Sequence, residues 1–270
     1  MDLDERPIGV FDSGVGGLTV LKELKRALPN ERFLYIGDTA RVPYGTKSPS
    51  TILDFARSVI RFLVEKDVKL IVIACNTTSA VGLPVLQGLF DLPIIGVLKP
   101  GAYEAVRATR KGRIGVIGTE ATISSGVYER EIKMLDPDVK VFSKACPLFV
   151  PLVEEGWIED EVTKIVASRY LGELKDVGID TLLLGCTHYP PLKKVIGEVM
   201  GDDVRLVDSA EATAAQVRDH LDAHGIMAGE GEGDVEFFVT DAPERFRRVG
   251  RAIIGEDIGD VKLIFLSGER

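Results

Sequence analysis

The stretch Leu70-Ile-Val-Ile-Ala-Cys-Asn-Thr-Thr78 decides the fold class. Its consecutive apolar residues, Leu70 to Ala74, predict a strand that is buried on both faces, and the polar residues after Ala74 mark the end of that strand. The uncharged segment continues to Phe90, but Gly82, Pro84 and several polar side chains interrupt it. We therefore expect a buried strand, a polar turn and a helix rather than a membrane span.

Similar apolar runs alternate along the chain with segments of helical periodicity. The expected strands are Ile8–Phe11, Phe33–Ile36, Leu70–Ala74, Ile94–Val97, Ile114–Gly118, Lys140–Phe142, Thr181–Gly185 and Val204–Val207. The expected helices are Leu18–Leu28, Ile52–Leu63 with Ser48 or Ser50 as its cap, Val127–Leu135, Glu161–Leu174 and Leu192–Met200. Continuous apolar strands between amphipathic helices predict an α/β protein whose parallel sheets are covered on both faces.

Two passages indicate an internal repeat. Ile8-Gly-Val-Phe-Asp-Ser-Gly14 matches Ile114-Gly-Val-Ile-Gly-Thr-Glu120, and Ile71-Val-Ile-Ala-Cys-Asn-Thr77 matches Leu182-Leu-Leu-Gly-Cys-Thr-His188 at nearly the same offset. We interpret them as two similar doubly wound parallel-sheet lobes with pseudo-two-fold symmetry and an active site in the cleft between them.

The lobe boundaries are expected near Lys99-Pro100-Gly101 and near Val207-Asp208. Lobe A would comprise residues 1–98 and 209–270, and lobe B residues 99–208. The tail from Ser209 would thus return to lobe A, with Gly229–Gly233 as an acidic loop that carries no functional signal.

Composition narrows the class of protein. The chain has 270 residues, of which 45% are hydrophobic and 28% charged, as in an ordinary globular protein and unlike a disordered or fibrous one. Its net charge of −9 makes nucleic acid and anionic membranes unexpected partners. Three cysteines, an odd number, do not form a disulfide framework, and the acidic segment Met1–Glu5 is unlike a signal peptide, so we expect a reducing, cytoplasmic location.

The chemistry is expected where polar residues follow the strands, because ligands of open α/β sheets bind outside the carboxyl ends of the strands. Four segments qualify: Asp12–Gly14, Gly37–Thr39, Cys75–Thr78 and Cys186–Tyr189. A cysteine at the start of a helix can be activated as a thiolate, although free cysteines are also common as small buried hydrophobes. Facing lobes would place Cys75 and Cys186 on opposite sides of one cleft, the arrangement that racemisation or epimerisation requires.

The turn Asp12–Gly17 offers exposed N–H groups that suit a carboxylate or a phosphate. A nicotinamide cofactor is disfavoured, because Thr19 stands where the third glycine of a dinucleotide motif belongs and Asp12 would face the pyrophosphate.

The other candidates leave alternatives open. His188 could orient or protonate a substrate group, tune the thiol, or be a satisfied polar histidine. Glu154 could hold an ammonium group or lie in a solvated turn. Cys146, which precedes Pro147, is interpreted as structural. His220 and His224 can share a helix face but lack a third ligand, so no metal site is expected.

Six collinear motifs resemble the glutamate racemases, a family of cofactor-independent amino-acid racemases. They are Val10–Gly17 (VFDSGVGG), Gly37–Gly45 (GDTARVPYG), Ala74–Ala80 (ACNTTSA), Cys146–Glu154 (CPLFVPLVE), Leu184–Pro190 (LGCTHYP) and Val207–Ser209 (VDS). The resemblance covers roughly residues 7–220 and is loose beyond them. One departure is Lys99, before Pro100-Gly101, where the family often has Glu, which bears on the lobe junction or a dimer contact rather than on the chemistry.

The resemblance implies interconversion of L- and D-glutamate, supplying D-glutamate for peptidoglycan, without pyridoxal phosphate or metal. It implies that Cys75 and Cys186 are the two bases, the first serving D-glutamate and the second L-glutamate. Asp12 and His188 would assist the thiols, and Glu154 would lie close to the second cysteine. The residues implied to hold the substrate's carboxylates and amine are Ser13, Tyr44, Gly45, Asn76, Thr77 and Thr187.

The family commonly forms homodimers, and we expect the same here. Two alternatives stay open: an aspartate racemase or related amino-acid racemase, and a non-catalytic ligand-binding or regulatory protein on the same scaffold.

Overall fold

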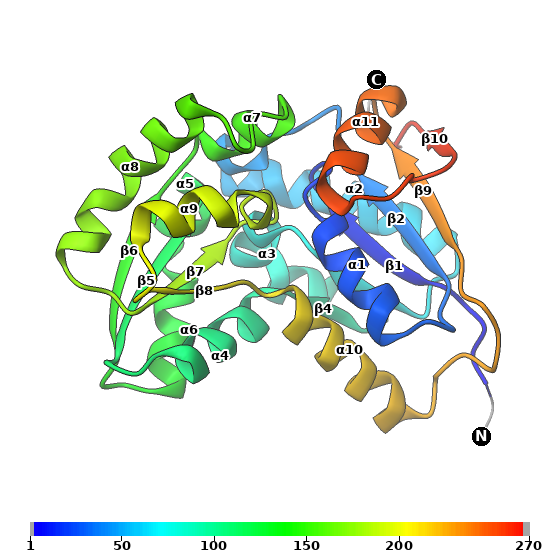
Figure 1. Cartoon of the computed structure of the whole chain (residues 1–270). Helices are drawn as coiled ribbons and strands as arrows, with labels where there is room; N and C mark the ends of the chain where they lie inside the picture. Colours follow the sequence, from blue (N-terminus) through cyan, green and yellow to red (C-terminus); the bar gives the residue numbers. More distant parts are fainter. Residues whose placement is uncertain (1–2, 267–270) are drawn as a thin grey trace.

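The computed structural model describes residues 3–266, which fold into two α/β lobes (Figure 1). The first sheet has the strand order β10-β9-β2-β1-β3-β4 and the second the order β6-β5-β7-β8. The strands of the first sheet are β1 (Ile8–Asp12), β2 (Phe33–Gly37), β3 (Leu70–Ile73), β4 (Ile94–Gly96), β9 (Val235–Val239) and β10 (Val261–Leu263). Those of the second are β5 (Arg113–Gly118), β6 (Lys140–Ala145), β7 (Thr181–Gly185) and β8 (Arg205–Val207). Neighbouring strands pair in parallel in both sheets.

Helices cover both sheets, as expected for parallel strands that are buried on two faces. They are α1 (Leu18–Ala27), α2 (Pro49–Glu65), α3 (Asn76–Leu89), α4 (Leu98–Ala108), α5 (Glu120–Ser124), α6 (Val127–Leu135), α7 (Phe149–Glu154), α8 (Glu161–Asp176), α9 (Lys193–Met200), α10 (Ala210–His224) and α11 (Pro243–Ile254). Short 3₁₀ turns occupy Tyr44–Thr46 and Pro190–Leu192. Ser48 caps α2 by accepting a hydrogen bond from the Thr51 amide at 3.3 Å, one of the two caps that the sequence offered.

The internal repeat is confirmed in the strand order. β2-β1-β3-β4 of the first sheet and β6-β5-β7-β8 of the second each place the first strand of their half between the second and the third. The ladder register agrees with the sequence match, because Gly9 pairs with Ile71 and Gly115 pairs with Leu182. The strands that carry Cys75 and Cys186 at their ends are therefore equivalent elements of the two lobes.

The C-terminal part of the chain completes the first sheet. β9 pairs with β2, β10 pairs with β9, and α10 and α11 pack on α1. β9 and β10 thus belong to the first sheet, and the sequence analysis did not locate these four elements. In Figure 1 they form the gold-to-red edge of that lobe, with α11 above the sheet and α10 below it.

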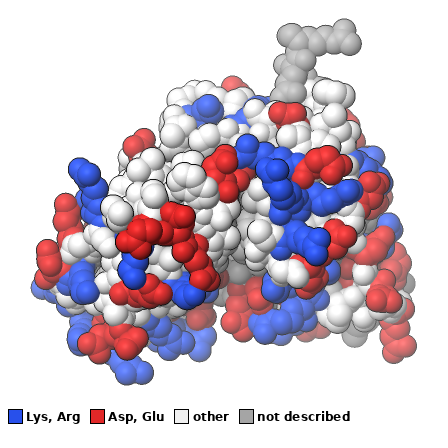
Figure 2. All heavy atoms as spheres, turned by 45° about the horizontal axis from the view of Figure 1, so that its top comes forward, with Lys and Arg blue, Asp and Glu red and all other residues white. Residues whose placement is uncertain are grey.

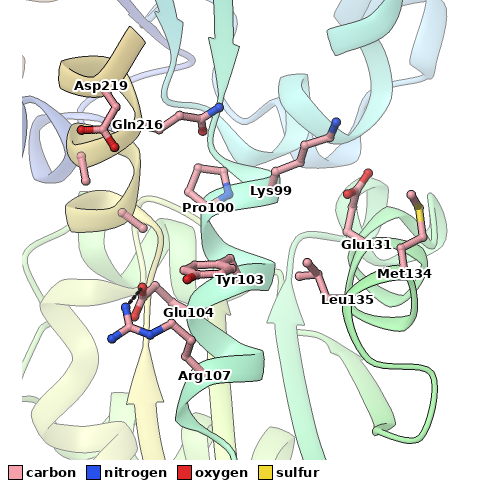
Figure 3. Close-up of a pocket in the computed structure, with 12 residues that line it drawn as sticks. Lys99, Pro100, Tyr103, Glu104, Arg107, Glu131, Met134, Leu135, Gln216 and Asp219 are labelled. Atoms are coloured by element: carbon pink, nitrogen blue, oxygen red, sulfur yellow. Dashed lines mark hydrogen bonds and ion pairs between the residues drawn. The ribbon is translucent and has the colours of Figure 1, made fainter. Parts of the chain in front are cut away.

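Lys99 lies inside α4, so the junction suggested near this residue is helical. α4 packs on α6 and β7 of the second lobe and also on α10. Between α4, α6 and α10 is a cavity of about 660 Å³ with Lys99 on its rim beside Gln216 and Glu131 (Figure 3). Lys99 is thus placed where the two lobes meet.

Charge is distributed without one dominant sign. Figure 2, which brings the top of Figure 1 forward, shows acidic and basic side chains intermingled over both lobes on that face. In the described part of the chain no helix is both long enough and apolar enough to cross a membrane.

Candidate active site

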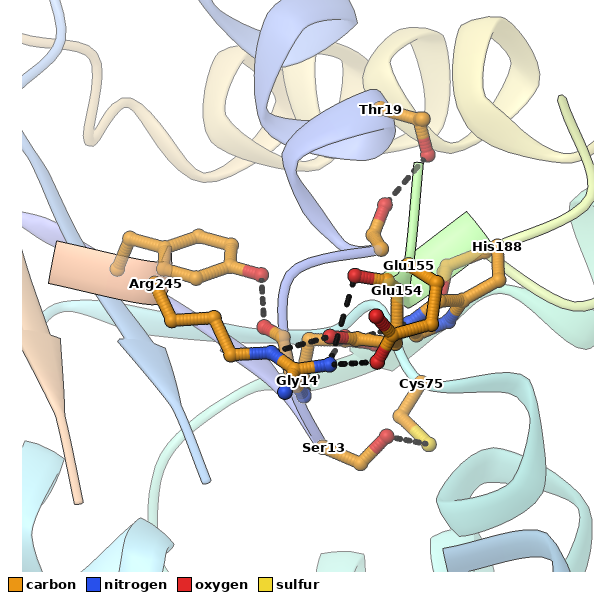
Figure 4. A network of polar contacts seen from close by, with 12 residues as sticks. Ser13, Gly14, Thr19, Cys75, Glu154, Glu155, His188 and Arg245 are labelled. Atoms are coloured by element: carbon orange, nitrogen blue, oxygen red, sulfur yellow. Dashed lines mark hydrogen bonds and ion pairs between the residues drawn. The ribbon is translucent and has the colours of Figure 1, made fainter. Parts of the chain in front are cut away.

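Cys75 follows β3 and caps α3. Its Sγ accepts a hydrogen bond from the Thr78 amide at 3.5 Å and donates to the Ser13 hydroxyl oxygen at 3.7 Å (Figure 4). Burial and the nearby charge of Asp12 raise the pKa of the Cys75 thiol to about 11, although the hydrogen bonds with Thr78 and Ser13 oppose the shift. A thiol with this pKa is protonated at neutral pH.

Cys186 occupies the equivalent position after β7 and is also buried. His188 is close enough to Cys186 for the two groups to interact, and its Nε2 lies 2.9 Å from Oε1 of Glu154. Burial lowers the pKa of His188, but the hydrogen bonds with Cys186 and Glu154, together with their charges, outweigh it and raise that pKa well above its usual value of 6.5. The raised pKa favours the cationic form of the imidazole beside the second sulfur.

Glu154 is the carboxylate partner of that imidazole. Burial raises its pKa, but the hydrogen bond from His188 and the charges of His188 and Arg245 leave the pKa lower than usual. The solvated-turn alternative for Glu154 is not what the structure has, since its side chain is only 16% exposed and is paired with His188.

Asp12 connects the two halves of the site. Its side chain is fully buried and accepts hydrogen bonds from the Gly14 amide at 3.0 Å and from the Thr187 hydroxyl at 3.2 Å. Burial raises the pKa of Asp12, against the opposing effects of the His188 charge and of hydrogen bonds from Gly17, Gly14 and Thr187. One carboxyl group therefore acts on Cys75 and also contacts the residue next to Cys186.

Side chains after β3 reach the other lobe. Asn76 donates from Nδ2 to the Tyr128 hydroxyl at 2.7 Å, and the Thr77 hydroxyl is hydrogen-bonded to those of Thr119 at 2.9 Å and Thr122 at 3.3 Å. Burial raises the pKa of Tyr128, and so does the charge of Cys186, while the hydrogen bond from Asn76 opposes them. Tyr128 thus hydrogen-bonds the residue that follows Cys75, and it is close enough to Cys186 for the charge of that thiol to affect its pKa.

Two glycines allow the lobes to approach closely. A Cβ on Gly16 would lie 2.5 Å from both Nδ1 of His188 and Oγ1 of Thr187. A Cβ on Gly45 would lie 2.4 Å from the Cβ of Thr119. Atoms cannot approach to these distances, so both positions require glycine for the interlobe contact rather than for any phosphate.

The loop that ends in Tyr44 is held by Asp38. The Tyr44 hydroxyl donates to Asp38 Oδ2, Arg41 donates to the same oxygen from Nε at 2.7 Å, and Thr240 of the C-terminal segment donates to Oδ1 at 2.9 Å. Tyr44 is fully buried, and its hydroxyl is committed to Asp38.

The structure brings together most of the residues expected at the site. Their shared environment is the layer where the two lobes meet, and they are Asp12, Ser13, Cys75, Asn76, Thr77, Glu154, Cys186, Thr187 and His188. Cys146 lies deeper, where its Sγ is 3.7 Å from the Lys144 carbonyl and its own carbonyl accepts from the Tyr189 hydroxyl at 2.9 Å. His220 and His224 stack on α10 with ring centroids 4.1 Å apart, and Nδ1 of His224 is bonded to the His220 carbonyl.

Sequence reasoning missed Thr119, Thr122 and Tyr128, whereas Asp38 lies in the Gly37–Thr39 segment that the strand ends had singled out. A signal existed for Thr119, because the internal repeat aligns it with Ser13. None existed for Tyr128, whose hydroxyl reaches Asn76 only through the packing of α6.

Two protonatable sulfurs at equivalent strand ends, each with its own polar neighbours, can act as an acid and a base on one ligand. The N–H and hydroxyl groups between them can stabilise charge on that ligand.

Comparison with known proteins gives a single family. Residues 8–217 match the model of the Asp/Glu/hydantoin racemase family. The chain is 52% identical to the glutamate racemase of Geobacter metallireducens over 266 residues, covering 98% of each chain.

Solved structures agree. An isoform of glutamate racemase from Bacillus anthracis superimposes with a TM-score of 0.94 at 40% identity, covering 97% of this chain and 98% of its own. Glutamate racemase from Francisella tularensis, solved in complex with D-glutamate, gives a TM-score of 0.92 at 39% identity and covers 98% of this chain and 99% of its own.

Proposed function

The chain belongs to the Asp/Glu/hydantoin racemase family and is an isomerase; on that basis we propose that it interconverts L- and D-glutamate with Cys75 and Cys186 as two bases. The observation that carries the proposal is the equivalence of the two thiols, which follow matching strands of two repeated sheets. The residue after each cysteine, Asn76 or Thr187, forms a hydrogen bond to the other lobe. The pairing of the F. tularensis relative with D-glutamate supports glutamate as the substrate.

In the proposed reaction one cysteine is a thiolate and the other a thiol. The thiolate takes the proton from Cα of glutamate, breaking the C–H bond and leaving the electron pair on the carbon, which becomes planar. The thiol on the opposite face gives its proton to that carbon, so the configuration inverts and the two sulfurs exchange protonation states. Proton exchange with solvent then restores the starting state.

The weakly acidic Cα–H makes the surrounding electrostatics decisive. A positioned base contributes about 10²–10⁴-fold, so the groups around the carboxylate must supply much of the remaining acceleration. We propose that Ser13, Gly45, Asn76, Thr77 and Thr187 offer their N–H, hydroxyl and amide groups to the substrate.

The neighbours of the two sulfurs have separate proposed roles. Asp12 assists Cys75, whose pKa its charge helps to raise. His188, held cationic by Glu154, can donate a proton to Cys186 and so assist the second thiol.

Substitution of either thiol tests the assignment. Cys75→Ala and Cys186→Ala should each lower racemisation of glutamate by at least about 10²–10⁴-fold, because each removes one of the two bases. Circular dichroism at a wavelength where glutamate absorbs measures the reaction, and far-ultraviolet dichroism of the protein checks that the fold is kept. A single mutant that racemises at the wild-type rate would exclude that thiol.

Isotope incorporation tests whether two bases act. In deuterium oxide, with the reaction stopped early, deuterium should enter the product enantiomer and be nearly absent from recovered substrate. Early label in the substrate would indicate one shared base.

Racemisation of L-aspartate, measured beside that of L-glutamate, separates a glutamate racemase from an aspartate racemase. No turnover of either amino acid would leave a ligand-binding role.

We propose further that the product D-glutamate serves peptidoglycan synthesis in the cytoplasm. The three free cysteines favour a reducing compartment. Depleting the protein should make growth depend on added D-glutamate.

We also propose that two lobes, residues 1–98 with 209–270 and residues 99–208, close on the substrate. We propose in addition that the protein is a homodimer, which sedimentation equilibrium would test.

A further inference from the structure

Arg245 is an arginine of the C-terminal helix that no part of the sequence analysis assigned. It lies in α11, next to Phe246, whose ring is buried 5.7 Å from that of Tyr35. The Tyr35 hydroxyl donates in turn to the Gly14 carbonyl at 2.8 Å, in the loop that follows Asp12. The backbone at Arg245 is therefore fixed to the core of the first lobe.

The side chain of Arg245 reaches the second lobe (Figure 4). Its Nη2 lies 3.0 Å from Oε1 of Glu155 and donates to the Glu154 carbonyl at 3.4 Å, and its Nε lies 4.0 Å from Oε2 of Glu154. The other carboxylate oxygen of Glu154, Oε1, is bonded to His188 at 2.9 Å. The two oxygens of Glu154 thus face two cations from opposite sides, one from each lobe.

We propose that Arg245 is a positioning residue for the racemase reaction, tying α11 to Glu154 and Glu155 across the mouth of the cleft and holding Glu154 against His188. It touches neither sulfur, so it acts through Glu154. The contact of Arg245 with Glu154 and Glu155 joins the lobes, and it also fixes the Glu154 carboxylate that orients His188. Closure of the lobes therefore also positions His188 beside Cys186.

The ion pair between Arg245 and Glu155 is exposed enough to form and break as the lobes move. The side chain of Arg245 is 45% exposed and that of Glu155 is 62% exposed, so solvent weakens their attraction. A cavity of about 500 Å³ lies beside them, with Val42 and Pro43 of the first lobe facing Leu148 and Pro151 of the second, and Arg245 and Glu154 are also in its wall. Parting of the lobes would break the ion pair at this wall at low cost.

The inference rests on the proposed racemisation of glutamate, and the full-length enzyme tests both. Arg245→Ala should raise KM for both enantiomers by about two- to fivefold, the range expected for a partly exposed ion pair, and should change kcat less, because bound substrate itself holds the lobes together. Arg245→Lys should keep most of the wild-type KM. Glu155→Gln should raise KM in the same direction, and Arg245→Ala with Glu155→Gln should be no worse than Arg245→Ala alone.

Arg248→Ala is the matched control, since Arg248 is exposed on the same helix, and it should leave KM unchanged. Melting temperatures of all variants should stay near that of the wild type. An unchanged KM in Arg245→Ala, additive effects in the double variant, or a lowered melting temperature with KM unaffected would each overturn the positioning role. A wild-type enzyme that does not racemise glutamate would instead overturn the proposed function.

Discussion

The unequal surroundings of the two sulfurs are set by single residues. Ser13 and Asp12 act on Cys75, whereas the Glu154–His188 pair acts on Cys186. The pair is nearly enclosed, with His188 2% and Glu154 16% exposed, so each ion depends on the other for its charge. Removing either partner leaves the other charge buried without compensation.

This pair makes stability depend on pH in a known direction. Folding raises the pKa of His188 above 6.5, so the stability that it contributes is full below pH 6.5 and is lost as pH rises through the folded-state pKa. Folding lowers the pKa of Glu154 below 4.5, so its contribution is present above pH 4.5 and is lost as pH falls through the folded-state value. The difference in unfolding free energy between wild type and His188→Gln should therefore be largest between about pH 4.5 and 6.5 and should narrow above that window.

Urea denaturation at a series of pH values measures the difference. Lys164→Gln, which removes an exposed ion pair with Glu198, is a control that should leave the pH dependence as it is. A difference that widens as pH rises above 6.5 would contradict a cationic His188.

The sequence predicted which residues lie at the site better than it predicted their hydrogen-bond partners. Cys75, Cys186 and His188 could be found because each follows an apolar strand, where ligands of this sheet type bind. The Tyr44–Asp38 and Asn76–Tyr128 bonds could not be found, because each partner's position depends on how a loop or helix packs rather than on sequence spacing.

At the scale of elements, the loop between β1 and α1 makes a close contact between the lobes. Gly16 lies against the residues that follow β7, with no space for even one added carbon. The loop therefore fixes how near the two sheet ends can come.

Gly16→Ala should separate the two halves of the site. The new Cβ would meet Nδ1 of His188 and Oγ1 of Thr187 at 2.5 Å, so one loop must move. A displacement of about 1 Å can cost about 10²-fold in rate, and we expect kcat/KM to fall by about that factor. Gly88→Ala in α3 is the control, since nothing lies within 4 Å of its added Cβ, and it should stabilise the protein by about 0.5–1 kcal/mol with activity unchanged. Equal activity in both variants would show that the loop adapts.

The elements themselves were predictable where burial was complete. β1, β3 and β7 are buried at every residue, so their sequences are dominated by apolar residues. β10 is three residues long at the edge of the sheet with Lys262 and Leu263 exposed, and α10 buries two alanines and a threonine beside Val217 and Leu221, so both carry much weaker patterns. The C-terminal elements were consequently not located from the sequence.

At the scale of the whole molecule, one buried ion pair joins three distant segments. Lys69 Nζ lies 2.7 Å from Oε2 of Glu31 with both side chains at most 1% exposed, and it also donates to the carbonyls of Asp4 and Ile226. Glu31 accepts from the Ala228 amide at 2.8 Å. The pair holds the start of the chain and the connection after α10 against the base of the first sheet.

Lys69→Met should destabilise the protein by about 3–5 kcal/mol, because it leaves the Glu31 carboxylate buried without its cation. Chemical denaturation measures this loss, and the folded variant should keep its kcat, since the pair lies at the amino ends of the strands, opposite the thiols. The double variant Lys69→Met with Glu31→Gln should recover part of the lost stability. A loss below about 1 kcal/mol in the single variant would mean that water or another group compensates Glu31.

The repeated strand order has a consequence for handedness. A chain of L-amino acids has no mirror symmetry, so it cannot offer mirror-image binding sites to the two enantiomers. Two repeated lobes related by an approximate two-fold axis only approximate such sites. The halves differ in detail, with a hydroxyl beside one sulfur and an imidazole beside the other. The forward and reverse reactions should then have unequal turnover numbers and unequal Michaelis constants, while their quotients stay equal, because the equilibrium between enantiomers in achiral water favours neither.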